Sequence, residues 1–337
     1  MKIGIMGLPN VGKSSLFNIL TQGHVQVAKF PFTTIDRNVG IVIIPDERLE
    51  KIIEVTKAPK IKYASIELVD IAGLIKGASR GDGLGNKFLA HIRDVDLSIH
   101  LLRCFDDPDI PHTDVQIRPK FDYEIVRTEL FLADLAVVER RLDKIKKKAE
   151  CRDELRILDR IREALNNGQI PDDRIDDLPL LSTKKELIVL NFDEDGKSRV
   201  DIEGLDAYKI STKLEEDIGG FTEDERRSLR KDAGLNPDGL AGLLKKCMDE
   251  LSIILFYTIK GDETRAWPIK SGSSVIQAAG LIHTDIQQGF IKAEILNWQD
   301  FISKGGFGPA QQNGSTRIEG KEYIVKDGDI ILIKFRK

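Results

Sequence analysis

The stretch GLPNVGKSS, Gly7–Ser15, decides the fold of this chain. It fits the pattern Gly-x-x-x-x-Gly-Lys-Ser and lies between an apolar run, KIGIM, and a segment of helical character, LFNILT. A strand before the loop and a helix after it are the context in which this pattern binds phosphate, because backbone N–H groups and the positive helix end face the anion. Lys13 would reach the β- and γ-phosphates, and the hydroxyl of Ser14 would bind Mg²⁺. The stretch therefore predicts a nucleoside triphosphate site.

Short apolar runs of the same kind recur up to about Phe121. VGIVII (39–44), SIELVDI (65–71) and LSIHLLRCF (97–105) are too short for globular helices and too continuous for half-exposed strands. They are typical of strands in a sheet that is covered on both faces, and they alternate with helical or glycine-rich segments. The predicted fold class is therefore α/β.

Two later segments depart from this pattern. Residues 122–183 are rich in charge, and DELRILDRIREALNNG (153–168) places its apolar residues three or four positions apart, as an amphipathic helix does. We expect an antiparallel helical arm here, inserted into one nucleotide-binding domain that comprises residues 1–121 and 184–251. From 252 to 337, short strands separated by turns predict a separate β-rich domain.

The composition narrows the class of protein. The chain has 337 residues, enough for two or three domains, and a net charge of −4, which gives no general attraction to nucleic acid. No DNA partner is expected, and an RNA contact would be local. The sequence has no run of about eighteen apolar residues, so no membrane span is predicted. Cys104, Cys151 and Cys247 lack metal-ligand spacing and are expected to be reduced thiols in a cytoplasmic protein.

Further residues of a phosphate-transfer site follow in chain order. Thr33 and Thr34 in FPFTTID could offer a second hydroxyl to Mg²⁺, and Asp70 in LVDIAG ends an apolar run where a carboxylate would hold Mg²⁺ through water. The N–H of Gly73 would contact the γ-phosphate. Alone, each could be an ordinary loop, capping or turn residue, but their order favours a site. Leu74 stands where a Ras-type enzyme has the glutamine that orients water, so slow intrinsic hydrolysis is expected.

The stretch ELIVLNFDEDG, Glu186–Gly196, carries the expected base-recognition loop. A guanine site would have Asn-Lys-x-Asp, whose aspartate accepts hydrogen bonds from the N1–H and the exocyclic amine of guanine. Here Glu194 is one methylene longer and would crowd the guanine edge, whereas the amide of Asn191 can pair with adenine. Phe192 replaces the lysine and could still pack on a ring face. The loop therefore favours ATP over GTP.

Taken together, these motifs identify a resemblance that spans nearly the whole chain. GLPNVGKSS, FPFTTID, DIAGLIKGASRGDGLGN, NFDE and the C-terminal RAWPIKSGSSVIQAAGLIHTDIQQGFIKAE resemble the YchF branch of the Obg-like ATPases. The resemblance implies a Ras-like P-loop domain, an inserted coiled-coil arm and a C-terminal TGS domain of β-grasp fold. It also implies Mg²⁺-dependent ATP hydrolysis and association with ribosomes, in translation or stress responses.

The resemblance also assigns roles to single residues. Those expected to hold the ATP phosphates are Asn10, Val11, Gly12, Lys13, Ser14 and Ser15. Ser14 and Thr34 would hold Mg²⁺, and Asn191 with the backbone of Phe192 would meet adenine, with Ser211 in the last loop around the base. His112 in DDPDIPHTD lies where the family has a histidine proposed to replace the missing glutamine; a polar loop histidine without a catalytic role is the alternative.

Two other functions fit much of the same sequence. One is a GTPase of the Obg class that also carries a TGS domain, from which Glu194 distinguishes this chain. The other is a non-catalytic adaptor, in which ATP only stabilises a conformation that binds the ribosome. The two alternatives predict different nucleotide preference and different turnover.

Overall fold

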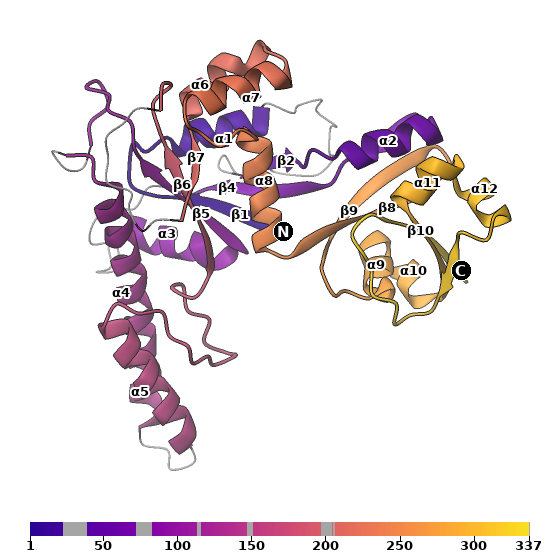
Figure 1. Cartoon of the computed structure of the whole chain (residues 1–337). Helices are drawn as coiled ribbons and strands as arrows, with labels where there is room; N and C mark the ends of the chain where they lie inside the picture. Colours follow the sequence, from indigo (N-terminus) through magenta and orange to yellow (C-terminus); the bar gives the residue numbers. More distant parts are fainter. Residues whose placement is uncertain are drawn as a thin grey trace. The chain divides into compact units, whose positions relative to one another are not determined.

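The computed structural model describes residues 1–22, 39–71, 83–112, 116–146, 151–196, 204 and 206–336. Thr33, Thr34, Gly73 and Leu74 lie outside the described residues. By its internal contacts the chain forms two compact units (Figure 1). The first comprises Met1–Val42 and Glu67–Leu243, and the second comprises Ile43–Ile66 and Leu244–Lys337.

A six-stranded sheet is the centre of the first unit, in the order β2-β4-β1-β5-β6-β7. The pairs β1–β4, β1–β5, β5–β6 and β6–β7 are parallel. The strands are β1 (Lys2–Met6), β2 (Val39–Ile43), β4 (Ser65–Asp70), β5 (Leu97–Arg103), β6 (Lys185–Asn191) and β7 (Tyr208–Ile210). All seven residues of β5 are buried, including the polar side chains of Ser98, His100 and Arg103, as expected for a central strand covered on both faces. The carboxyl ends of β1, β4, β5, β6 and β7 share one edge of the sheet, which is where ligands bind in α/β folds.

The helices of the first unit connect these strands. Their bounds are α1 (Lys13–Gln22), α3 (Gly83–Asp94), α4 (Pro119–Ile145), α5 (Arg152–Asn166), α6 (Thr212–Asp217), a 3-10 turn (Ile218–Gly220), α7 (Glu223–Asp232) and α8 (Gly239–Glu250), at which the chain passes to the second unit. Within the described residues, no helix combines the length and apolar character that a membrane span requires.

Helices α4 and α5 form the expected arm, and Figure 1 shows them as a pair that extends from the sheet. Their apolar residues meet in one buried cluster, because spacings of three and four place them on facing sides of the two helices. The cluster consists of Val138, Leu142 and Ile145 of α4, of Leu158, Ile161 and Leu165 of α5, and of Leu180 from the segment after α5. The arm belongs to the same compact unit as the sheet.

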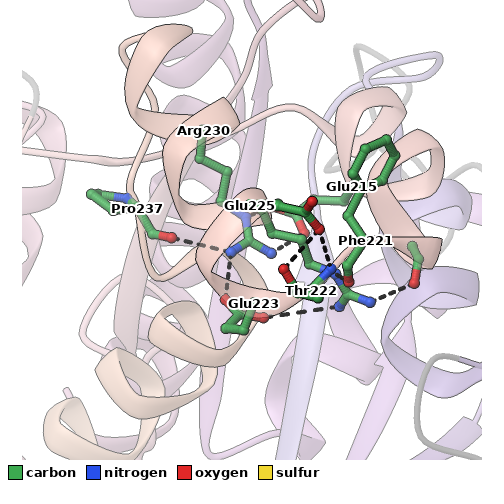
Figure 2. Close-up of polar contacts among 9 residues, drawn as sticks. Glu215, Phe221, Thr222, Glu223, Glu225, Arg230 and Pro237 are labelled. Atoms are coloured by element: carbon green, nitrogen blue, oxygen red, sulfur yellow. Dashed lines mark hydrogen bonds and ion pairs between the residues drawn. The ribbon is translucent and has the colours of Figure 1, made fainter.

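Helices α6 and α7 are joined by a buried ion pair (Figure 2). Arg230 in α7 donates from Nε and Nη2 to the two carboxylate oxygens of Glu215 in α6, at 2.8 and 3.0 Å. Its Nη1 donates to Glu223 and to the carbonyl of Pro237. Both side chains of the main pair are nearly inaccessible to solvent. Two parallel hydrogen bonds of this kind fix direction as well as distance, so α7 sets the position of α6.

A second six-stranded sheet, in the order β11-β10-β12-β8-β9-β3, is the centre of the second unit. Its strands are β3 (Lys60–Lys62), β8 (Ile253–Lys260), β9 (Glu263–Lys270), β10 (Phe290–Asn297), β11 (Arg317–Glu319) and β12 (Asp329–Phe335). Its helices are α2 (Glu47–Thr56), α9 (Val275–Ile282), α10 (Thr284–Gln288), α11 (Trp298–Lys304) and α12 (Phe307–Gln312). The hairpin β8–β9, the parallel pair β8–β12 and the antiparallel pairs of β10 give the β-grasp arrangement.

The segment Ile43–Ile66 lies within this second unit, although it falls in the part of the sequence expected to form the nucleotide-binding domain. Strand β3 pairs in parallel with β9, and α2 begins at the capping residue Asp46. The hydroxyl of Tyr257 donates to Asp46 at 2.5 Å, and Arg48 pairs with Asp327 at 2.6 Å. The loop between β2 and β4 is thus built into the fold of the C-terminal unit.

Candidate nucleotide-binding site

The phosphate loop follows β1 and depends on two glycines with positive φ. Gly7 has φ +148 and Gly12 has φ +98, in the region that side chains with a Cβ rarely adopt. A Cβ on Gly12 would also lie 2.4 Å from Nδ2 of Asn191. The loop can therefore follow this path only with glycine at these positions.

Lys13, the first residue of α1, is largely buried at the start of this helix. Its Nζ donates to the carbonyl of Leu8 within the loop at 2.7 Å. Burial lowers the pKa of Lys13 to about 8, and the charge of Asp70 partly opposes this effect. An anion bound in the loop would restore the charged form, so the ammonium group is suited to binding phosphate.

Ser14 and Asp70 come together from α1 and from the end of β4. The hydroxyl of Ser14 donates to Oδ2 of Asp70 at 3.0 Å. A hydroxyl and a carboxylate are the hard oxygen donors that Mg²⁺ prefers, and Mg²⁺ usually takes one or two protein ligands together with phosphate oxygens. Within the described residues, no group of three or more His, Cys, Asp or Glu side chains could hold a metal by itself. The residues present therefore fit a Mg²⁺ ion that arrives with the nucleotide.

A cavity of about 690 Å³ opens beside the phosphate loop, at the carboxyl ends of the strands. Its volume is within the range of small-molecule sites. Three segments of the first unit complete its wall: the loop after β5, the loop after β6, and the first turn of α6. The lining residues are Asn10, Gly12, Lys13, Ser14, Ser15, Phe105, Asp106, Asp107, Pro108, Ile110, Phe192, Asp193, Glu194, Thr212, Lys213 and Glu216.

Asn191 and Ser211 lie behind this wall. The amide of Asn191 donates to the carbonyl of Val11 at 3.0 Å and accepts from the N–H of Thr212 at 2.9 Å. Ser211 caps α6 by accepting from the N–H of Leu214. In the described structure both residues hold the phosphate loop and α6 in place; the second N–H of the Asn191 amide is the group through which the predicted contact with adenine would be made.

Glu194 and Phe192 lie in the cavity wall. The carboxylate of Glu194 forms an ion pair with Lys213 of α6, and the hydrogen bond from Lys213 holds the pKa of Glu194 below its usual range. Phe192 packs into a buried apolar cluster with Leu102 and Leu190 and still contributes to the wall. Lys213 thus contacts Oε1 of Glu194, one of the two carboxylate oxygens at the position where a guanine site has its aspartate.

The loop after β5 is positioned by Arg103, which the sequence reasoning did not single out. Its guanidinium group is fully buried and donates to the carbonyls of Phe105, Asp107 and Ile110, at 3.0, 3.2 and 3.0 Å. The group also lies over the ring of Phe105, 4.4 Å from its centroid. One side chain therefore holds residues 105–110 of this loop. An arginine at the end of an apolar strand, in LLRCFDDPD, is the signal that could have identified it.

His112 follows the residues that Arg103 holds, and the residue before it, Pro111, contacts the phosphate loop. The side-chain amide of Asn10 donates to the carbonyl of Pro111 at 3.0 Å. Nε2 of His112 lies 3.1 Å from Oδ2 of Asp122, in the first turn of α4. His112 is not among the described residues that line the cavity.

Comparison with known proteins agrees with this architecture. A family model described as a 50S ribosome-binding GTPase matches residues 2–147, and a model named YchF-GTPase_C, described as a protein of unknown function, matches residues 253–336. A structure titled as a GTP-binding protein from Pyrococcus horikoshii shares the fold over the whole of both chains, with a TM-score of 0.61 and 19% identity.

More similar proteins cover both units. The "Ribosome-binding ATPase YchF" of Bacillus subtilis is 38% identical over 98% of each chain, and that of Escherichia coli O157:H7 is 38% identical over 99% of each. The structure of the Schizosaccharomyces pombe YchF GTPase is 30% identical, with a TM-score of 0.84, and the match covers 99% of this chain and 97% of that one. The chain therefore belongs to the YchF family of P-loop proteins.

Proposed function

We propose that this protein is a Mg²⁺-dependent ATP-binding and ATP-hydrolysing switch that associates with ribosomes in the cytoplasm. The observation that carries the proposal is the geometry of the phosphate site, where the buried ammonium of Lys13 lies beside the Ser14–Asp70 pair. The relatives of similar length from Bacillus subtilis and Escherichia coli are named ribosome-binding ATPases, which supports the ribosome as partner.

Each residue of the phosphate site has a defined task in this proposal. Lys13 binds the β- and γ-phosphates and stabilises the charge that develops on them during attack by water. Ser14 and Thr34 would hold Mg²⁺, with Asp70 contributing its carboxylate through water, and the ion would supply further positive charge. The N–H of Gly73 contacts the γ-phosphate. Leu74 cannot orient water, so the intrinsic rate is low and His112 is our candidate for that task.

The base loop supports ATP as the nucleotide. Glu194 is paired with Lys213 through one carboxylate oxygen, so guanine would compete with this ion pair, and the longer side chain would crowd the ring. Adenine needs no carboxylate acceptor and can be met by the amide of Asn191 and the backbone of Phe192. Since the relative from Schizosaccharomyces pombe carries the name GTPase, the preference of this chain needs its own test.

A double substitution tests the base loop directly. Glu194→Asp combined with Phe192→Lys restores the guanine pattern Asn-Lys-x-Asp, and we expect it to raise the affinity for GTP relative to ATP by about tenfold, the size of one well-placed pair of hydrogen bonds. Isothermal titration with non-hydrolysable analogues measures the ratio. Glu216→Asp, which shortens another carboxylate of the same cavity, should leave it unchanged. An unaltered ratio in the double variant would place the discrimination outside this loop.

Sedimentation with purified ribosomes tests the proposed partner. The protein is expected to pellet with ribosomes to different extents in ATP, in ADP and without nucleotide, because a switch must bind its partner differently in its two states. Ribosomes should also accelerate phosphate release. Equal binding to ribosomes in all three conditions would contradict the proposed switch. Ribosome-stimulated turnover no faster than that of a Lys13→Ala variant would favour the non-catalytic adaptor.

A further inference from the structure

His112, the residue proposed above to orient the attacking water, is buried and lies close to a carboxylate. Its side chain is only 6% exposed, and the carboxylate of Asp122, at 2% exposure, lies 3.1 Å from Nε2. His112 does not line the cavity, as far as the described residues show. An imidazole that assists water at the γ-phosphate would have to leave this partner first.

Helix α4, which carries Asp122, is fixed to the sheet by buried polar contacts. Arg127 donates to the carbonyl of Ser182 at 3.2 Å and lies 3.4 Å from the carboxylate of Glu186. Asp134 accepts from the N–H groups of Leu181 and Ser182, both at 2.8 Å. These bonds tie the base of α4 to the chain that leads into β6, so the carboxylate of Asp122 is a fixed point.

The loop that carries His112 is tied to the nucleotide site at its other side. Arg103 orders residues 105–110 through three carbonyls, and the amide of Asn10 holds the carbonyl of Pro111. Because Asn10 belongs to the phosphate loop, a nucleotide that rearranges this loop also pulls on the residue next to His112. The hydrogen bond between His112 and Asp122 opposes this pull.

We propose that Asp122 is a positioning residue that holds His112 away from the phosphate site until a bound nucleotide draws the loop over. This inference rests on the proposed role of His112 in hydrolysis. Asp122 then lowers the basal rate further, because a charge-assisted hydrogen bond must be broken before the imidazole can act. The arm helix contributes this restraint through its first turn, without contact with the nucleotide.

Steady-state phosphate release by the full chain, without ribosomes, tests this restraint. Asp122→Ala is expected to raise kcat by about tenfold with KM unchanged, since one charge-assisted hydrogen bond is lost from the resting state only. Asp122→Asn keeps the size and a weaker, neutral hydrogen bond and should raise kcat by about threefold. The double variant His112→Ala/Asp122→Ala should be as inactive as His112→Ala. Glu124→Gln, an exposed carboxylate on the same helix, is the matched control and should behave as the wild type.

The outcomes distinguish the role of His112 in hydrolysis from its restraint by Asp122. Full activity of His112→Ala would remove His112 from hydrolysis and this inference with it. Loss of activity in His112→Ala, combined with an unchanged or lower kcat in Asp122→Asn, would keep the proposed function and overturn the restraint. A raised kcat that persists in the double variant would also overturn it, because the gain would not pass through His112. Thermal unfolding checks that each variant folds. If Asp122→Ala does not fold, the kcat of Asp122→Asn provides the test.

Discussion

Replacing Lys13 with alanine is expected to lower the rate of ATP hydrolysis by about a thousandfold. One preorganised group that stabilises the negative charge of the transition state typically raises the rate by about two to three orders of magnitude. Nucleotide affinity should fall as well, since the ammonium also contacts the bound phosphates. Phosphate release under saturating MgATP measures the first effect, and titration with a fluorescent ATP analogue measures the second. Hydrolysis that survives at more than a tenth of the wild-type rate would contradict the role given to Lys13.

The buried position of Lys13 adds a pH dependence to this prediction. Burial lowers its pKa to about 8 in the free protein. The charged form binds phosphate, so kcat/KM, which reports the free enzyme, is expected to be constant below this pKa and to fall as the pH rises through about 8. Lys13→Arg, whose guanidinium stays charged, should lose this decline even if its rate is lower. A decline of the same shape in Lys13→Arg would assign the titration to another group.

Replacing Arg230 with alanine is expected to lower the free energy of unfolding by about 3–5 kcal/mol, because the substitution leaves the carboxylate of Glu215 buried without its partner. Burial opposes the charged form of Arg230, but the hydrogen bonds and the charge of Glu215 outweigh this and raise its pKa. Arg230 is therefore charged in the folded protein. Equilibrium unfolding in urea, followed by circular dichroism, measures the change.

A neighbouring arginine provides the control for this experiment. Arg227 lies in the same helix and pairs with Asp238 at 3.3 Å, but both side chains are more than half exposed. Arg227→Ala should therefore cost less than about 1 kcal/mol. Similar losses of unfolding free energy in the two variants would mean that the ion pair between Arg230 and Glu215 contributes little to stability. Since α6 carries Thr212, Lys213 and Glu216 in the cavity wall, Arg230→Ala should also weaken nucleotide binding at temperatures where it remains folded.

The phosphate site could be predicted from the sequence because its geometry is local. The glycine spacing around Lys13 fixes the path of the loop within nine residues, and the order of strands brings Asp70 to the same edge of the sheet. The parallel α/β unit, the helical arm and the β-grasp order of the C-terminal strands followed from apolar periodicity and from the resemblance to the YchF family. Each of these features depends on signals within a few tens of residues.

Other parts of the structure depend on contacts between residues that are far apart in the sequence, which local sequence patterns do not predict. Strand β3 is three residues long and charged, and it becomes a strand only because β9, two hundred residues later, offers a free edge. Arg103 could be read as the end of a strand, but its three carbonyl partners depend on how the next loop folds back. The contacts of Asn191 and Ser211 with the base stay a prediction. Their bonds that hold the wall, and the place of Thr212 and Lys213 in its lining, follow only from the folded chain.

The proposed function depends on a preference for ATP over GTP, and the dissociation constants of the two nucleotides measure this preference most directly. Isothermal titration of the nucleotide-free protein with MgATP and MgGTP analogues, side by side, should give ATP the tighter binding by about tenfold or more, the difference that one mispaired base edge produces. GTP binding as tight as that of ATP, or tighter, would contradict the account and place the chain among the GTPases.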